Sequence, residues 1–247
     1  MATYHNQEAD ILYEIMGILS NASLPVIFKG ANITRLILKE NGSNMFRATG
    51  DIDCDWQSPV TMDELATKLN NCLIPQGFTA ESFRVFSGTA KSAGFNIKRN
   101  GVLVCKIDIG MKTILQSRKY HYGSYSFNGV LVDKVIADKL HAISTKYVYR
   151  RPKDMIDLFA LSECVSFRTS DIKEMIFNDG RKLGEGTELF NDKEMVLHGY
   201  KLLRGVENKP DAEECYERCC TLLNGMFDNE NLFWDFENRK YVFMRTV

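Results

Sequence analysis

The sequence predicts an α+β fold in two parts, a mixed β-sheet lobe with flanking helices over residues 1–132 and an α-helical lobe over residues 133–247. Short apolar runs with the two-residue period of strands recur between residues 24 and 109. Asn100-Gly101 joins two of these runs, as in a tight hairpin. After Val132 the apolar residues recur every three or four positions, as in amphipathic helices. This change of period predicts the boundary between the two parts.

The first part begins with an amphipathic helix, because Ile11, Ile15 and Leu19 share one helix face. A short apolar run then leads into a small-residue turn and a second helix. Thr61 followed by Glu64 has the spacing of a capping box and predicts the start of a third helix. The expected helices span 7–20, 31–40 and 61–73, and the expected strands span 24–29, 51–56, 79–87, 92–99, 102–109 and one or two segments within 113–132.

The second part reads as a succession of helices followed by an aromatic tail. Pro152 suits the first turn of a helix, where its missing N–H costs nothing. The tail alternates aromatic and polar residues and predicts a small hairpin. The expected helices span 133–149, 152–164, 170–179, 192–204 and 211–227, and the expected hairpin spans 232–236 and 241–243.

Composition places the chain among ordinary globular proteins, with 247 residues, 45% apolar residues and a formal net charge of −1. No apolar run approaches the roughly 20 residues of a membrane span, so we expect no membrane partner. The first residues lack the basic and apolar pattern of a secretory signal. Seven cysteines, an odd number in mostly apolar stretches, favour reduced thiols and a cytoplasmic location.

Asp51 and Asp53 form the most informative pair of residues in the chain. On a strand, residues two positions apart share one face about 7 Å apart, so both carboxylates can reach one ligand. This spacing suits hard divalent cations, which take oxygen ligands and bridge to phosphate. A pair of this kind is also common on polar protein surfaces, so the pair alone does not decide between the two.

A strand ending in Lys29, followed by Gly30-Ala31-Asn32 and a helix, precedes the aspartate pair. Such a turn directs backbone N–H groups and a helix N-terminus at an anion. A glycine after a strand equally marks an ordinary turn. The order of the two features favours a phosphate cradle beside a metal-binding pair, and hence chemistry on a nucleoside triphosphate.

Asp108 is a third candidate carboxylate, in the second arm of the hairpin at Asn100-Gly101. If this arm pairs with strand 51–56, Asp108 can reach a cation held by the aspartate pair. The alternative is a charged residue near a strand end that faces water. Asp55 lies further along the same face and is expected to support the site or face water.

Lys139 shares a helix face with Ala142 and Ile143. A lysine on an apolar face either extends to water or meets an anion, so a phosphate contact is the functional interpretation. Asp154 and Asp157 lie on one side of the next helix. Acidic residues in a first turn also stabilise a helix through its dipole, which is the alternative for Asp154.

Four segments stand in order along the chain, namely Phe28-Lys29-Gly30-Ala31-Asn32-Ile33-Thr34-Arg35-Leu36, Arg47-Ala48-Thr49-Gly50-Asp51-Ile52-Asp53, Asp138-Lys139-Leu140-His141-Ala142 and Lys153-Asp154-Met155-Ile156-Asp157-Leu158. Together they resemble the motifs of the AbiEii/AbiGii toxin nucleotidyltransferases, within the DNA polymerase β-like nucleotidyltransferase superfamily. The family pattern has Gly-Gly-Ser/Thr in the phosphate turn, where this chain has Gly30-Ala31-Asn32. Asn32 retains a donor for phosphate, whereas Ala31 is restricted to negative φ.

The resemblance implies a two-lobed, nucleotidyltransferase-like enzyme that moves a nucleoside monophosphate from a triphosphate to an acceptor and releases pyrophosphate. It implies the toxin of a type IV toxin–antitoxin system with tRNA or another RNA as acceptor, a cognate antitoxin as partner, and Mg²⁺ or Mn²⁺ as cofactor. The implied nucleotide-binding residues are Lys29, Gly30, Asn32 and Lys139, the metal-binding residues are Asp51, Asp53 and, by superfamily logic, Asp108, and the catalytic residues are Asp51, Asp53, Asp108, Lys139 and Asp154, with Asp157 as a structural neighbour.

Two alternatives stay open. The acceptor could be a small molecule such as an aminoglycoside, or a protein side chain. The departure at Ala31 and Asn32 also leaves open a catalytically weak nucleotide-binding module.

Overall fold

The structure is a computed structural model that describes residues 2–86, 92–228 and 231–243. The chain divides into two compact units, and both are discontinuous in sequence. The first contains Met1–Leu36 and Ala48–Leu131, and the second contains Ile37–Arg47 and Val132–Val247. The predicted α+β class is confirmed. The functional division at residue 132 stays a prediction.

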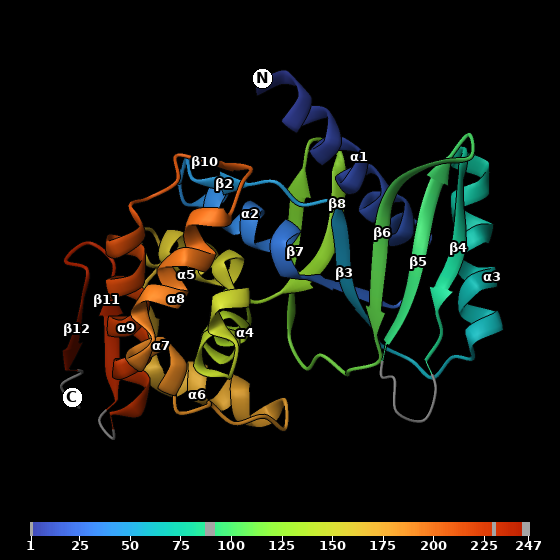
Figure 1. Ribbon diagram of the computed structural model, residues 1–247. Helices are drawn as coiled ribbons and strands as arrows, with labels where there is room; N and C mark the ends of the chain where they lie inside the picture. Colours follow the sequence, from blue (N-terminus) through green and yellow to red (C-terminus); the bar gives the residue numbers. More distant parts are fainter. Residues whose placement is uncertain (1, 87–91, 229–230, 244–247) are drawn as a thin grey trace. The chain divides into compact units, whose positions relative to one another are not determined.

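The first unit is a seven-stranded mixed sheet with helices. Its elements are α1 (Ala2–Asn21), β1 (Val26–Lys29), the start of α2 (Gly30–Glu40), β3 (Asp51–Trp56), α3 (Met62–Leu73), η1 (Ile74–Gln76), β4 (Phe78–Arg84), β5 (Ser92–Arg99), β6 (Val102–Gly110), β7 (Ser117–Tyr122) and β8 (Tyr125–Val130). The strand order is β4-β5-β6-β3-β1-β8-β7 (Figure 1). The β3–β6 and β1–β8 pairs are parallel and the other pairs are antiparallel.

One face of this sheet is apolar and the other is polar. Ile52 and Cys54 of β3 are fully buried, whereas Asp51 is exposed and Asp53 is half-buried. This is the period-two alternation of a sheet that covers a core on one side. The apolar face packs on α1 and α3, and Tyr13 of α1 stacks on Phe127 of β8. The polar face is therefore the one that can present functional side chains.

Two local predictions in the first unit are confirmed by their geometry. Asn100 and Gly101 have φ values of 52° and 78° between β5 and β6, as the predicted tight hairpin requires. The hydroxyl of Thr61 accepts from the Glu64 N–H, and the Glu64 carboxylate accepts from the Thr61 N–H, which completes the capping box. The strand predicted over 79–87 ends at Arg84, and its last predicted residue, Ser87, lies outside the described residues.

The second unit is mainly helical. Its elements are the end of α2, β2 (Phe46–Arg47), α4 (Val132–Ser144), η2 (Val148–Arg150), α5 (Pro152–Ser162), β9 (Phe167–Arg168), α6 (Thr169–Asn178), α7 (Thr187–Asn191), α8 (Lys193–Leu202), β10 (Val206–Glu207), α9 (Ala212–Phe227), β11 (Leu232–Asp235) and β12 (Lys240–Phe243). The helix predicted over 133–149 was too long. It ends at Ser144, and Tyr147 then takes a left-handed conformation with φ of 65° that no helix continues.

The aromatic tail forms the predicted hairpin, with β11 and β12 antiparallel and β9 on the other side of β11. Trp234 is fully buried, and its indole N–H donates to the Ser162 carbonyl at 2.9 Å. The hairpin thereby fastens the end of the described chain to the helices. All seven cysteines are free thiols. Of the described helices, none has the length and hydropathy to cross a bilayer.

Candidate active site

Three of the predicted carboxylates share the polar face of the sheet. β3 and β6 pair in parallel, and Asp53 stands directly opposite Asp108 in the register. Asp51 lies two residues before Asp53 and faces the same way. The strand pairing on which the interpretation of Asp108 depended is thus confirmed, and Asp108 is half-buried rather than fully exposed.

Gly30 joins β1 to α2 and lies directly against Asp53. Its φ of 69° is left-handed, and a Cβ built on it would stand 2.3 Å from Oδ2 of Asp53. No other residue type satisfies both conditions. Gly30 is the first residue of α2, and Ala31, the second, has no positive φ, so the left-handed conformation falls on Gly30 alone. The departure from the family's second glycine is therefore compatible with this turn.

Asn32 is 2% exposed, and its side-chain amide donates to the Asp51 carbonyl at 2.8 Å. The Tyr13 hydroxyl donates in turn to the Asn32 carbonyl at 3.2 Å. This arrangement ties the first turn of α2 to the strand that carries Asp51. The phosphate contact predicted for Asn32 stays a prediction, and in this structure the side chain positions Asp51.

Lys29, the last residue of β1, pairs with Asp55 at 2.6 Å between Nζ and Oδ2. Asp55 is 1% exposed, so the expectation that it could face water was wrong. Gly110 makes room for this pair, because a Cβ there would lie 2.1 Å from Oδ1 of Asp55. Among the described atoms, that same Oδ1 has no hydrogen-bond partner.

A row of residues crosses five strands of the polar face at the level of the carboxylates. The row runs Arg84, Gly94, Asp108, Asp53 and Lys29, each opposite the next in the register. Arg84 reaches over Gly94 and forms an ion pair with Asp108. The two carboxylates at the centre therefore have a basic residue on each side.

Within the described residues, no three His, Cys, Asp or Glu side chains converge on a point that could hold a metal ion. The chemistry of the carboxylates on the polar face nevertheless suits such an ion. Asp51, Asp53 and Asp108 supply only oxygen ligands, which Mg²⁺ and Mn²⁺ prefer. Because Arg84 holds an oxygen of Asp108, a cation at this carboxylate would compete with the guanidinium.

The remaining predicted residues meet in the second unit, in an ion cluster that joins β2, α4 and α5. The Lys139 ammonium lies 2.9 Å from Asp154 Oδ1 and 2.7 Å from Asp157 Oδ2. Arg47 makes two parallel hydrogen bonds to Asp157, at 2.8 and 2.9 Å. Lys139 and Asp157 are buried, whereas the side chain of Asp154 is 18% exposed.

Charge pairing outweighs burial in this cluster. Burial alone lowers the pKa of Lys139, but the carboxylates of Asp157 and Asp154 raise it well above its usual value. Burial likewise opposes ionisation of Asp157, yet Lys139 and Arg47 hold the pKa of Asp157 below its usual value. Both groups are therefore charged at neutral pH.

Arg47 is the member of this cluster that sequence reasoning missed. It lies in the segment just before the aspartate pair, but its partner Asp157 is 110 residues away. Nothing local marks such a contact. The only indirect signal was Asp157 itself, an acidic residue among the apolar residues of its helix.

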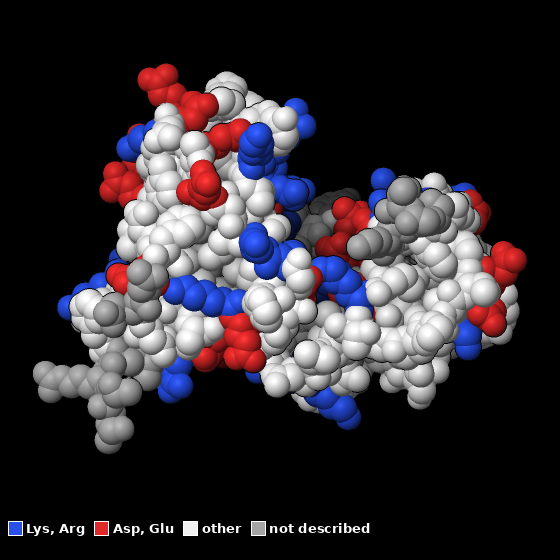
Figure 2. Space-filling view, turned by 90° about the horizontal axis from the view of Figure 1, so that it is seen from below, with Lys and Arg blue, Asp and Glu red and all other residues white. Residues whose placement is uncertain are grey.

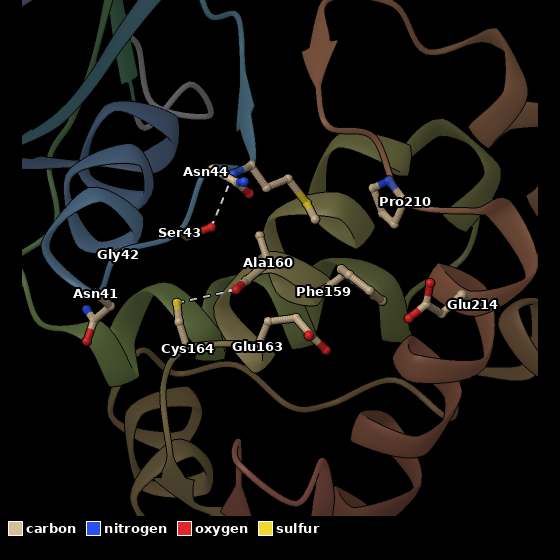
Figure 3. A pocket seen from close by; sticks show the side chains of 11 residues that line it. Asn41, Gly42, Ser43, Asn44, Phe159, Ala160, Glu163, Cys164, Pro210 and Glu214 are labelled. Atoms are coloured by element: carbon tan, nitrogen blue, oxygen red, sulfur yellow. Dashed lines mark hydrogen bonds between the residues drawn. The ribbon is translucent and has the colours of Figure 1, made fainter.

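The second unit also has a surface hollow of about 450 Å³ between the loop that follows α2, the helix α5 and the start of α9 (Figure 3). Glu163 and Glu214 face it, together with the Cys164 thiol, which donates to the Ala160 carbonyl at 3.4 Å. None of the predicted site residues lines this hollow.

A strand–glycine turn–helix unit, with paired carboxylates on β3 and a third on its parallel neighbour β6, is the arrangement of a nucleotidyltransferase. Residues 12–238 match the family model described as nucleotidyl transferase AbiEii toxin, type IV toxin–antitoxin system. The chain belongs to this family, so the resemblance in the sequence is confirmed. It is a nucleotidyltransferase toxin, an enzyme that transfers a nucleoside monophosphate from a nucleoside triphosphate and releases pyrophosphate.

Solved structures share the fold. The chain is similar to MenT4, a nucleotidyltransferase toxin from Mycobacterium tuberculosis H37Rv, with 14% identity, a TM-score of 0.60 and coverage of 92% of this chain and 85% of that one. It is also similar to JHP933 from Helicobacter pylori, with 12% identity, a TM-score of 0.55 and coverage of 90% and 91%. At such identity the likeness concerns the fold alone. No curated protein sequence matches significantly.

Proposed function

We propose that this toxin uses a divalent cation, Mg²⁺ or Mn²⁺, to transfer a nucleoside monophosphate to an RNA acceptor, with tRNA as the favoured class, in the cytoplasm. One observation carries the proposal. Asp53 and Asp108 stand side by side on neighbouring strands, on the face shared with Asp51, and the Gly30 turn lies directly against Asp53. A phosphate cradle and cation ligands are thus within one short stretch of the sheet.

In the proposed reaction, a hydroxyl oxygen of the acceptor attacks the α-phosphorus of the triphosphate and a new P–O bond forms. The bond from the α-phosphorus to the bridging oxygen breaks, and pyrophosphate leaves with that electron pair. The hydroxyl proton passes to a base or to water. Such a transfer depends on positioning and on neutralising the charge of the phosphates.

The Gly30 turn, the three carboxylates and Lys29 each have a part in this scheme. The N–H groups at the start of α2, behind Gly30, receive the phosphates. Asp51, Asp53 and Asp108 hold the cation, which when bound neutralises phosphate charge and activates the attacking hydroxyl. Lys29 is paired with Asp55 at 2.6 Å, and this pairing keeps its ammonium at the end of β1, beside the turn.

The two other residues of the proposal, Lys139 and Asp154, belong to the second unit. An ammonium that already contacts two carboxylates has little net charge to offer to a phosphate. We therefore assign Lys139 a positioning role, in which it fixes the orientation of Asp154. Asp154 is the more exposed carboxylate of the pair, 18% against 4% for Asp157, and is the one that can act as a base or orient a substrate group.

The segment Lys146–Lys153 supports RNA as the acceptor class. Its cations Lys146, Arg150, Arg151 and Lys153 are all exposed. Tyr147 is 54% exposed, and the Arg150 guanidinium lies 5.2 Å from the centre of its ring. Interleaved cations and aromatic rings suit a phosphate backbone with unpaired bases. The left-handed conformation of Tyr147 is the kind of strain that persists where a side chain is needed at the surface.

The test is a transfer assay with purified protein, each α-labelled nucleoside triphosphate in turn, and total RNA, small molecules or protein as separate acceptors. We expect labelled RNA with Mg²⁺ and none with a chelator. Asp51→Asn should lower transfer by about a hundredfold or more. Asp63→Asn, an exposed carboxylate at the start of α3, is the matched control and should leave transfer unchanged.

The same assay decides the alternatives. Label on a small molecule or on protein, and not on RNA, would refute the RNA acceptor while keeping the enzyme. Nucleotide binding without release of pyrophosphate would favour a catalytically weak binding module. Undiminished labelling by Asp51→Asn would refute the assignment of the carboxylates.

A further inference from the structure

β4 presents an exposed aromatic ring on the polar face of the sheet. Phe83 is 46% exposed. The register of β4 against β5 shifts between Ser82 and Arg84, which marks a β-bulge. A bulge interrupts the alternation of side chains, so Phe83 and Arg84 both point to the polar face although they are consecutive. The ring lies over Gly94 of β5, where a Cβ would stand 2.5 Å from the tip of the ring.

Two cations flank this ring. The Arg84 guanidinium lies 5.7 Å and the Lys106 ammonium 5.6 Å from its centre. An exposed ring beside two positive charges is complementary to a nucleotide of a single strand, whose base stacks while its phosphates meet the cations. Core packing does not explain the ring, because close to half of its surface is exposed.

The ring lies on a defined side of the carboxylates. Gly94 is opposite Asp108, and Asp108 is opposite Asp53, so the ring stands about 10 Å from Asp53 at the usual strand spacing. The Gly30 turn lies on the other side of Asp53, at the end of β1. The carboxylates thus separate the phosphate turn from the ring.

This order of residues distinguishes the acceptor from the donor nucleotide. In phosphoryl transfer the attacking and leaving oxygens are roughly in line on opposite sides of the phosphorus. If the pyrophosphate leaves over the Gly30 turn, the attacking hydroxyl enters from the side of β6, β5 and β4. Phe83 stands on that side.

We propose that Phe83, with Lys106 and Arg84, is a binding subsite for an unpaired base and the adjoining phosphates of the RNA acceptor. The proposal rests on the proposed function, since it takes the phosphate turn as the site of the leaving pyrophosphate. Stacking holds the strand so that its reactive hydroxyl lies over the carboxylates, and Lys106 contacts the backbone. Arg84 can join it when Asp108 binds a cation.

The experiment compares Phe83→Ala and Phe83→Tyr with Phe177→Ala, a matched control at a 78% exposed ring on α6. The affinity of each variant for a single-stranded RNA oligonucleotide is measured in the absence of triphosphate. The KM for RNA and the KM for triphosphate are then measured in the transfer assay. Phe83→Ala should weaken RNA binding about tenfold to a hundredfold and raise KM for RNA, with KM for triphosphate unchanged. Phe83→Tyr should keep wild-type affinity, because it keeps the ring.

Lys106→Ala supplies a second, independent readout. It should weaken binding to all RNA sequences to a similar extent. It should also reduce the slope of log affinity against log salt concentration by about 1, the value for one lost phosphate contact. A raised KM for triphosphate alone in Phe83→Ala would overturn the acceptor subsite and assign the ring to the donor base. Unchanged RNA binding by Phe83→Ala would overturn the proposed subsite. Wild-type protein that labels no RNA would instead refute the proposed function, and the oligonucleotide affinities would still decide whether the ring binds RNA.

Discussion

At the scale of single residues, the geometry of the candidate site depends most directly on Gly30. It combines a left-handed φ of 69° with a Cβ position 2.3 Å from the Asp53 carboxylate. The first condition concerns the backbone alone, whereas the second concerns a group that we assign to cation binding. A substitution at this residue therefore tests stability and activity together, and a suitable control can separate them.

Gly30→Ala should lose about 1–3 kcal/mol of stability from backbone strain and most of its transfer activity, because Asp53 must move. Gly77→Ala is the matched control, since Gly77 has a φ of 80° with nothing within 4 Å of its Cβ position. Urea unfolding gives the two stability losses, and transfer of label gives the activities. Equal activity in the two variants would show that the close approach of Gly30 to Asp53 does not matter for transfer.

The Lys29–Asp55 pair makes a second prediction at this scale. Asp55 is almost fully buried while the Lys29 side chain is 26% exposed, so the pair is only partly screened by solvent. Asp55→Asn and Lys29→Met should each cost about 1–3 kcal/mol of unfolding free energy, less than for a fully buried pair. A double-mutant cycle from urea unfolding should give a coupling of about 0.5–3 kcal/mol. Strictly additive losses would mean that the two charges do not stabilise each other.

At the scale of elements, the signals that worked are local in sequence. The Asn100-Gly101 hairpin, the Thr61 capping box and the Asp51–Asp53 spacing each depend on a few consecutive residues, and the structure has all three features. Turn conformation, cap and strand face follow from backbone preference and periodicity, which a single sequence carries.

Contacts between distant segments were not predictable in the same way. The pairing of β2 with β10 joins two-residue strands far apart in the chain, and such short strands have no period to detect. The Asn32 amide meets the Asp51 carbonyl and Lys139 meets two carboxylates, yet both side chains read from sequence as phosphate ligands. A buried polar side chain of this type needs a polar partner, but only the tertiary packing determines which partner it has.

The ion cluster of β2, α4 and α5 predicts a pH dependence of stability. A carboxyl group whose pKa is lowered on folding contributes stability above its unfolded pKa of about 3.9, and that stability is lost as the pH falls through the folded value. Asp157 is such a group. The pKa of Lys139 is raised, so its contribution persists at all lower pH values and is lost only in strong alkali.

Asp157→Asn should therefore destabilise the protein at pH 7 by about 3–5 kcal/mol, because Arg47 and Lys139 lose a buried partner. The loss should shrink as the pH falls below about 4, because Asp157 of the unfolded wild-type chain then binds a proton that the folded protein binds only at lower pH. Urea unfolding at pH 7, 5, 4 and 3 measures both effects. Burial raises the pKa of Asp138, but Lys134 and Arg181 lower it further, so its pKa is also below the usual value. The stability of Asp157→Asn should therefore still fall in part as the pH is lowered. A difference between variant and wild type that stays constant over this range would contradict the account.

At the scale of the whole molecule, positive and negative charges nearly balance. The formal net charge is −1, and basic and acidic side chains are interspersed on the face shown in Figure 2. A protein with this balance cannot hold RNA through a uniformly positive surface. Binding of the RNA acceptor that we propose would then depend on small groups of residues, such as the segment Lys146–Lys153 and the ring of Phe83.

Binding of triphosphate and cation provides the last prediction, because a ligand that binds only the folded state raises its stability. At a hundredfold excess over Kd the gain is about 2.7 kcal/mol, and each kcal/mol raises the unfolding midpoint of a chain of this size by roughly 2–4 °C. We expect an upward shift of the thermal midpoint when Mg²⁺ and triphosphate are present together, and a smaller one when a chelator replaces Mg²⁺. Asp53→Asn should lose the dependence on Mg²⁺, since it removes the carboxylate against the Gly30 turn, whereas Asp63→Asn should keep it. An equal shift in Asp53→Asn and wild type would place the cation elsewhere.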